Sequence, residues 1–207
     1  MLSQEFMRNA LLAGTFVALA CGACGWFLVL RAQVFAGDAL GHVAFPGALA
    51  AAAAGIDERV GLFAATVLVA IAIGLLGRDA LAGRAGAGGA GARGSEDTAI
   101  GIAFTFVLGL GVLFLTLFSR GSGGAAGVQA ARTLFGSIFG LSAGQARLAA
   151  AIGAAATLAL AAIARPLLFA TVTPGVARAL GVRTRVLDLA FLALLGVVVA
   201  EAAQAVG

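Results

Sequence analysis

The stretch GDALGHVAFPGALAAAAAG at residues 37–55 joins two ionisable side chains to a run that is apolar enough to lie in lipid. Asp38 and His42, the only histidine of the chain, stand four residues apart. Side chains at this spacing share one face of a helix. A carboxylate and an imidazole on one face can bind a divalent cation or exchange a proton. Because ionisable groups inside a membrane span are costly, this pair is the first candidate for a functional site.

Pro46 and Gly47 follow His42 within about two turns of the same predicted helix. A proline inside a helix leaves a backbone carbonyl without its donor and bends the axis. Bent helices that line a cavity are common at transporter sites. An alternative interpretation makes Asp38 the N-cap of a helix that begins there, with His42 packed against a neighbour.

The rest of the chain has the composition of an integral membrane protein. Of its 207 residues, 62% are hydrophobic and 11% are charged, and its mean hydropathy is +1.10. Soluble domains carry roughly 25% charged residues. The 31 glycines allow helices to approach closely, and the strand alternation of a β-barrel is missing. We therefore expect an all-α, polytopic helical membrane protein with a single transmembrane domain over residues 1–207.

Charged residues divide this chain into about six predicted transmembrane helices. The predicted spans lie between Arg8 and Arg31, between Asp38 and Asp57, between Arg59 and Arg78, between Asp97 and Arg120, over about 148–164, and from near Val186 towards the C-terminus. Arg165 and Pro166 are expected to end the fifth span. The apolar piece between Arg132 and Arg147 is too short to cross the bilayer and fits a re-entrant or interfacial helix.

Three connecting segments carry their own signals. Residues 83–94 are glycine-rich and basic, which predicts a flexible cytosolic loop. Glu96 and Asp97 then offset the helix dipole in the first turn of the fourth span, with a metal site as the alternative. Residues 173–182 form a short helix outside the bilayer, with Pro174 in its first turn and Gly181 at its end.

The arginines indicate how the chain is oriented. All basic residues are arginine, and they stand at the ends of apolar segments, as the positive-inside rule predicts, which argues against nucleic-acid binding. With the N-terminus outside, most of them fall on the cytosolic side, together with residues 83–94 and 173–182. A P-loop requires a lysine, so the chain is not a Walker-type ATPase.

Four segments form an ordered set: GDALGHVAFPG at 37–47, EDTAIGI at 96–102, LFGSI at 134–138, and residues 173–182. They resemble the signature segments of zinc/manganese/iron ABC importer permeases, the ABC-3 family. In this resemblance Gly37, Pro46 and Gly47 belong to the structural motif around Asp38 and His42. Glu96 and Asp97 open the second segment, and the last segment resembles the cytosolic coupling helix that docks on a separate ATPase.

The resemblance implies a permease subunit of an ABC importer for divalent transition-metal ions, Zn²⁺ or Mn²⁺, in the bacterial cytoplasmic membrane. Asp38 and His42 would be the metal ligands, and no cofactor would be tightly bound. The coupling-helix residues that would contact the ATPase are Pro174, Val176, Ala177, Arg178, Leu180 and Gly181. Val176, Ala177 and Leu180 are spaced to form one narrow apolar stripe.

The implied partners are the ATPase subunit, an extracytoplasmic metal-binding protein, membrane lipid and a second copy of the chain. No nucleic acid is implied, and the chain itself would not be an enzyme. Two ligands from each of two copies would give the four of a transient tetrahedral site.

Some features depart from the family pattern. Thr173-Pro174-Gly175 stands where the family often has an acidic residue, residues 83–94 resemble an insertion, and Glu201 has no clear counterpart. Family members carry further spanning helices beyond the position that matches 204–207, so the resemblance predicts a C-terminally shortened permease.

Two other functions fit the sequence less well. The alternative is a stand-alone secondary transporter driven by protons through Asp38, His42 and Glu201. An intramembrane enzyme has less support, because the sequence shows no nucleophile–base pair and no second histidine.

Overall fold

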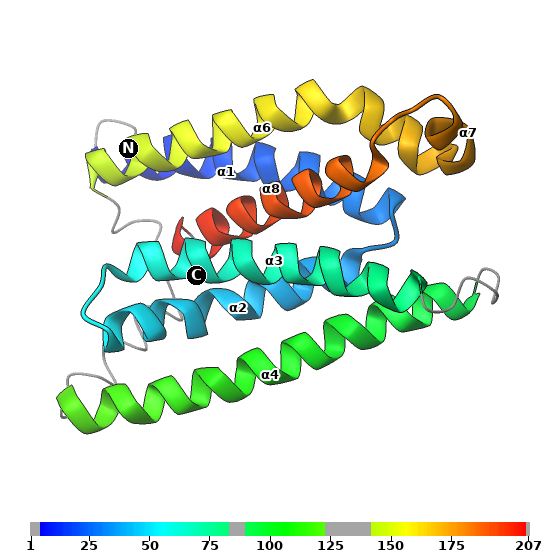
Figure 1. Ribbon diagram of the computed structural model, residues 1–207. Helices are drawn as coiled ribbons and strands as arrows, with labels where there is room; N and C mark the ends of the chain where they lie inside the picture. The colour runs from blue at the N-terminus through cyan, green and yellow to red at the C-terminus, as the bar shows by residue number, and fades with distance from the viewer. Residues whose placement is uncertain (1–4, 83–89, 123–141, 206–207) are drawn as a thin grey trace.

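The computed structural model shows a bundle of long helices that lie side by side, with successive helices reversing direction (Figure 1). It describes residues 5–82, 90–122 and 142–205, and it places no strand among them. The helices are α1 (Glu5–Leu30), α2 (Val34–Ala53), α3 (Glu58–Ala82), α4 (Ala90–Ser122), α6 (Ala143–Val172), α7 (Pro174–Ala179) and α8 (Thr184–Ala205). In this described part, six helices are long and apolar enough to cross a membrane, all except α7. The prediction of an all-α, multi-pass membrane protein is confirmed.

The six long helices share one apolar core. α8 lies between the pair α1 and α6 and the pair α2 and α3, and α4 lies against α2 and α3 at the edge of the bundle (Figure 1). Every long helix contributes buried side chains to the central cluster, among them Phe27, Leu40, Ala70, Ile100, Leu160 and Phe191. The turn between α1 and α2 lies at the same end of the bundle as α7 (Figure 1).

Glycines permit the closest helix contacts, as the composition predicted. α2 crosses α3 where Gly47 meets Gly61, and a β-carbon on Gly47 would lie 2.8 Å from the carbonyl oxygen of Gly61. α6 crosses α1 in the same way, since a β-carbon on Gly153 would lie 2.9 Å from the backbone of Phe16. Small residues of this kind let membrane helices pack backbone to backbone.

The start of α2 differs from one of the two interpretations of Asp38. The helix begins at Val34, its N-cap is Gln33, and no side chain caps it. Asp38 therefore lies in the second turn, and the N-cap interpretation is wrong. Pro46 lies inside α2, as predicted, and the helix continues past it to Ala53.

The end of the fifth span was predicted wrongly. α6 begins at Ala143, where Ser142 and Gln145 form a capping box, and it runs through Pro166 to Val172. Pro166 removes one backbone hydrogen bond. Beyond it, however, Leu167 and Ala170 are buried in the core. Tertiary burial of the apolar face stabilises the last turns of a helix that local sequence would end.

The start of α4 corrects two further predictions. α4 begins at Ala90, so residues 90–94 are helical, and 83–89 lie outside the described residues. Glu96 and Asp97 accordingly lie in the second turn of α4, not the first, and their side chains are not described. The segment 134–138 and most of the predicted re-entrant helix lie outside the described residues.

Candidate metal site

The helix α2 buries one face and leaves Asp38 and His42 on the other. Its buried residues include Ala36, Leu40, Val43 and Gly47, whereas Asp38, Gly41 and His42 are exposed. Because the spacing of four residues is realised on a continuous helix, the carboxylate and the imidazole share one face, with β-carbons roughly 5–6 Å apart. The structure thus brings the two predicted ligands together on an open surface of this chain.

The helix α4 flanks this surface. The imidazole of His42 meets the ring of Phe104 edge to face, with centroids 5.4 Å apart and planes at 64°. Two turns further along α4, Gly111 faces Pro46: a β-carbon there would lie 2.8 Å from the Cγ of the proline. Phe104 and Gly111 are seven residues apart and so share a face of α4. Sequence reasoning missed both residues, and only that seven-residue spacing could have pointed to them.

Pro46 leaves one backbone carbonyl of α2 without its helical partner. Since proline has no backbone N–H, the carbonyl of His42 has no donor four residues later. Helix carbonyls point toward the C-terminus, whereas side chains lean toward the N-terminus, so this oxygen is not counted with the side-chain ligands. The motif around Asp38 and His42 offers a carboxylate and an imidazole, a pair that suits Mn²⁺ or Zn²⁺.

The pair is not a complete metal site by itself. Among the described residues, neither Asp38 nor His42 makes a hydrogen bond or an ion pair with another side chain. In the same part of the chain, no group of three or more His, Cys, Asp and Glu side chains could hold a metal ion. A closed structural site needs about four protein ligands, so further donors must come from elsewhere.

Glu201 is the third residue of the proton-driven alternative. It is buried in the last turns of α8, next to Ala200, which packs in one cluster with Ala44 and Ala48 of α2. In the described part of the chain, its Oε2 atom has no hydrogen-bond partner. Nearby, the side-chain amide of Gln204 lies against the guanidinium of Arg59. The structure does not bring Glu201 together with Asp38 and His42 as the proton-driven alternative requires.

A short helix, α7, is present where the sequence predicted a coupling helix. Pro174 is in its first turn, and Gly181 follows its end at a φ of 79°. Two hydrogen bonds close that end, from Val182 N–H to the carbonyl of Ala177 and from Gly181 N–H to the carbonyl of Arg178, both 3.0 Å long. This is a Schellman motif, so the predicted start and stop of the helix are confirmed.

The exposed face of α7 differs from the predicted stripe. Val176 and Leu180 are 53% and 70% exposed, whereas Ala177 is fully buried. Ala177 belongs to the side of α7 that folds back on this chain, where α7 packs against α6 and α8. The prediction that Ala177 shares an available face with Val176 and Leu180 is therefore wrong. Pro174, Arg178 and Gly181 are exposed, so they remain open to a partner.

Comparison with known proteins identifies the family. The model of the ABC 3 transport family matches residues 3–207. The chain belongs to the ABC-3 family. Its relatives include the manganese transport system membrane protein MntC of Halalkalibacterium halodurans, 31% identical over the whole chain and 65% of the relative. The probable iron transport system membrane protein of Haemophilus influenzae is 28% identical, over the whole chain and 69% of that protein.

A solved structure supports the same assignment. PsaBC from Streptococcus pneumoniae, in complex with Fab, matches with a TM-score of 0.72 and 26% identity. The match covers 99% of this chain and 68% of the PsaBC chain. The chain thus spans about two thirds of the length of its ABC-3 relatives, such as the manganese import system permease protein ScaB of Streptococcus parasanguinis, of which it covers 66%.

Proposed function

We propose that this chain is the membrane-spanning permease subunit of an ABC importer for divalent transition-metal ions. The observation that carries the proposal is the exposed pair Asp38 and His42 on α2, beside α4, in a chain that the ABC-3 family matches almost from end to end. The donor set suits Mn²⁺ and Zn²⁺. The names of several relatives refer to manganese, which favours Mn²⁺ as the cargo.

In this proposal the metal ion is a substrate that binds transiently. Two strong ligands per chain bind a cation weakly enough to release it, as conduction requires. Two copies of the chain around an axis would supply four ligands. The proposed orientation places the N-terminus outside and α7 in the cytosol, where a separate ATPase would hydrolyse ATP and an extracytoplasmic protein would deliver the metal from the other side.

The exposed part of α7 supports the proposed docking of the ATPase. Val176 and Leu180 present apolar side chains beside Arg178. Apolar anchors on one side of a short helix suit a groove on a partner. The proton-driven alternative is less well supported, because Glu201, Asp38 and His42 do not form one group of side chains among the described residues.

Metal uptake in cells tests the proposal. His42→Ala removes the imidazole, and Asp38→Asn keeps the shape of the side chain but removes its charge. Both variants should insert normally and reduce Mn²⁺ accumulation to the level of cells without the transporter, because each removes one of the two ligands. Asp57→Asn is the matched control: the same change at an exposed residue outside α2, with uptake expected to be unchanged. Normal accumulation in both ligand variants would refute the metal role of the pair.

A further inference from the structure

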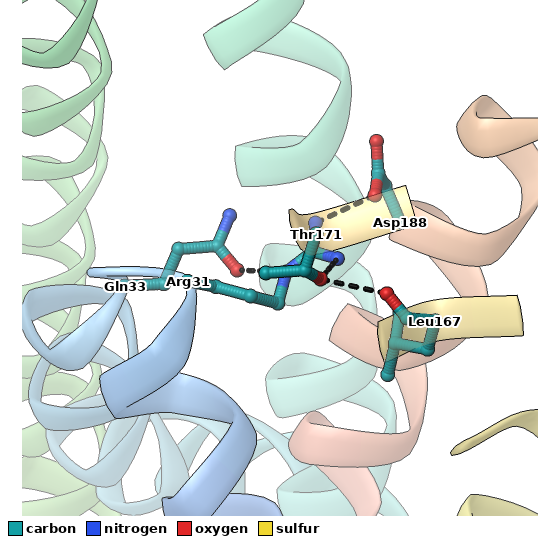
Figure 2. Close-up of polar contacts among 5 residues, drawn as sticks. All are labelled: Arg31, Gln33, Leu167, Thr171 and Asp188. Atoms are coloured by element: carbon teal, nitrogen blue, oxygen red, sulfur yellow. Dashed lines mark hydrogen bonds and ion pairs between the residues drawn. The ribbon is translucent and has the colours of Figure 1, made fainter. Parts of the chain in front are cut away.

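Arg31 is the centre of a polar cluster that joins three parts of the chain. This residue follows the last residue of α1, and its side chain is only 12% exposed. Each nitrogen of its guanidinium has a separate partner (Figure 2). Nη2 pairs with Asp188 Oδ1 at 2.5 Å, Nε donates to Gln33 Oε1 at 3.2 Å, and Nη1 donates to Thr171 Oγ1 at 3.4 Å. We call these four residues the Arg31 cluster.

Two further contacts fix the geometry of the cluster. The hydroxyl of Thr171 donates to the carbonyl of Leu167 at 2.7 Å, which orients its oxygen toward Arg31 (Figure 2). The guanidinium carbon lies 5.4 Å from the centre of the Phe191 ring, which is fully buried. A planar guanidinium can serve three polar partners and an aromatic face at once, whereas an ammonium group is a point charge.

The partners of Arg31 lie at the ends of three different helices. Gln33 is the N-cap of α2, the helix that carries Asp38 and His42. Thr171 lies in the last turn of α6, directly before α7, and Asp188 lies in the second turn of α8, soon after α7. The cluster therefore ties the start of the metal-bearing helix to both chain segments that hold α7.

The short turn between α1 and α2 holds Arg31 in a fixed position relative to the first turn of α2. Only Arg31, Ala32 and Gln33 separate the two helices. The N–H of Ala32 bonds to the carbonyl of Val29 at 3.1 Å, and the N–H of Gln33 to that of Leu28 at 2.9 Å. This is again a Schellman motif, and Ala32 occupies its left-handed position at a φ of 54°. A displacement of Arg31 is accordingly passed to the first turn of α2.

We propose that Arg31, held by Asp188, is a positioning residue that links movement of α7 to the metal-bearing helix α2. The inference rests on the proposed function, in which an ATPase docks on α7. When the ATPase moves α7, the ends of α6 and α8 carry Thr171 and Asp188 with them. Arg31 follows these two partners and shifts the N-terminus of α2, and with it Asp38 and His42.

Two conservative variants separate this role from simple stabilisation. Arg31→Lys keeps a positive charge for Asp188, but its donors all leave one nitrogen, so they do not reproduce the separate contacts of Nε with Gln33 and of Nη1 with Thr171. Asp188→Asn keeps the size of the side chain and removes the charge. Arg185→Lys is the matched control, since Arg185 is exposed at the same end of the bundle. All three variants are expected to fold, because each retains the volume and polarity of the original residue.

The first readout is the number of Mn²⁺ ions transported per ATP hydrolysed, measured on the permease reconstituted in liposomes with the ATPase that copurifies with it. Arg31→Lys and Asp188→Asn should keep ATPase binding and hydrolysis within about twofold of wild type, and should lower the ratio by about fivefold or more, the range of measured coupling between sites. Arg185→Lys should leave the ratio unchanged. A wild-type ratio in both cluster variants would overturn the inference.

The second readout needs neither ATPase nor metal. Spin labels are placed at Leu180→Cys on α7 and Val34→Cys on α2, both exposed positions, in a chain whose Cys21 and Cys24 are alanine. The distance distribution should be narrow with the cluster intact and broad in Arg31→Lys and Asp188→Asn. If the distances broaden in Arg31→Lys and Asp188→Asn but the transport ratio is unchanged, the cluster only stabilises the structure, and the positioning role is overturned. If the wild type itself transports no metal, the proposed function fails, and the distances still test the link.

Discussion

Arg31 and the pair Asp38 and His42 stand within one short stretch of chain but in opposite environments. Each guanidinium nitrogen of Arg31 is satisfied by a partner from this chain. Asp38 and His42 are exposed, and in the described part of the chain no third His, Cys, Asp or Glu side chain joins them. The side chain of Arg31 is thus fully paired within the chain, whereas the proposed function requires groups from outside the chain to complete the site at Asp38 and His42.

This difference follows from what each group has to do. A buried arginine without partners costs several kcal/mol, so a fixed connection requires full pairing. A transported cation must leave its site again, so a chain that saturated the metal by itself would hold it too tightly. The comparison predicts that an unpaired charge buried at the end that carries α7 destabilises the fold, whereas a change at Asp38 or His42 affects transport alone.

The largest expected structural effect is on the buried side of α7. Ala177→Asp places a charge where Ala177 is fully buried, and a buried unpaired charge costs several kcal/mol. Because α7 is short, we expect local opening: exchange of the amides of Gly181 and Val182, which bond back into α7, should accelerate at least about a hundredfold, since each 1.4 kcal/mol is a factor of ten. Mass spectrometry of hydrogen exchange measures this directly.

Leu180→Asp is the control for that change. Leu180 is 70% exposed, so a charge there remains in water and amide exchange in α7 should stay as in wild type. It should weaken only the binding of the ATPase. Equal acceleration of amide exchange in both variants would contradict the buried position of Ala177. The two sides of α7, one buried against this chain and one exposed, would then not differ.

How much of this could be predicted from sequence depends on the range of the contacts. Hydropathy and charge predicted the spans, and spacing alone placed Asp38 and His42 on one helix face. α6 continues through Pro166 because residues beyond it are buried by other helices, which a local rule does not see. Arg31 and Asp188 pair across 157 positions. Their charges marked the ends of apolar runs, but nothing in one sequence indicates that they meet.

A smaller effect is expected where α2 crosses α3. Gly47→Ala would place a β-carbon 2.8 Å from the carbonyl oxygen of Gly61, so the two helices must separate. Overpacking of this kind typically destabilises by about 1–3 kcal/mol. Thermal unfolding in detergent should show the loss, although neither Asp38 nor His42 is altered. Such a loss would show that the packing of α2, the helix that carries Asp38 and His42, depends on its crossing with α3.

Gly41→Ala tests the same substitution on the same helix without the clash. A β-carbon on Gly41 meets nothing within 4 Å. Alanine is preferred over glycine inside a helix by about 0.5–1 kcal/mol, so this variant should be as stable as wild type or slightly more stable. If Gly47→Ala proved equally stable, the close crossing of α2 and α3 would not be what fixes the position of Asp38 and His42.

The smallest expected effect concerns Ala32, which lies between Arg31 and α2. Ala32 has a φ of 54° and Gly181 a φ of 79°, and each is the second residue after a helix end. Left-handed backbone costs a residue with a β-carbon about 1–2 kcal/mol, so Ala32→Gly should stabilise the chain by about 1 kcal/mol and Gly181→Ala should destabilise it by a similar amount. Gly175→Ala, inside α7 with nothing within 4 Å, controls for the change in residue type. Chemical unfolding in detergent measures the free energy of unfolding of all three variants. Changes of the same sign for Ala32→Gly and Gly181→Ala would show that the left-handed backbone at these two positions is not strained.

Ala32→Gly also separates two routes from Arg31 to α2. A transport ratio that survives it, but falls in Arg31→Lys, means that the side chain of Gln33 rather than the turn backbone transmits the shift.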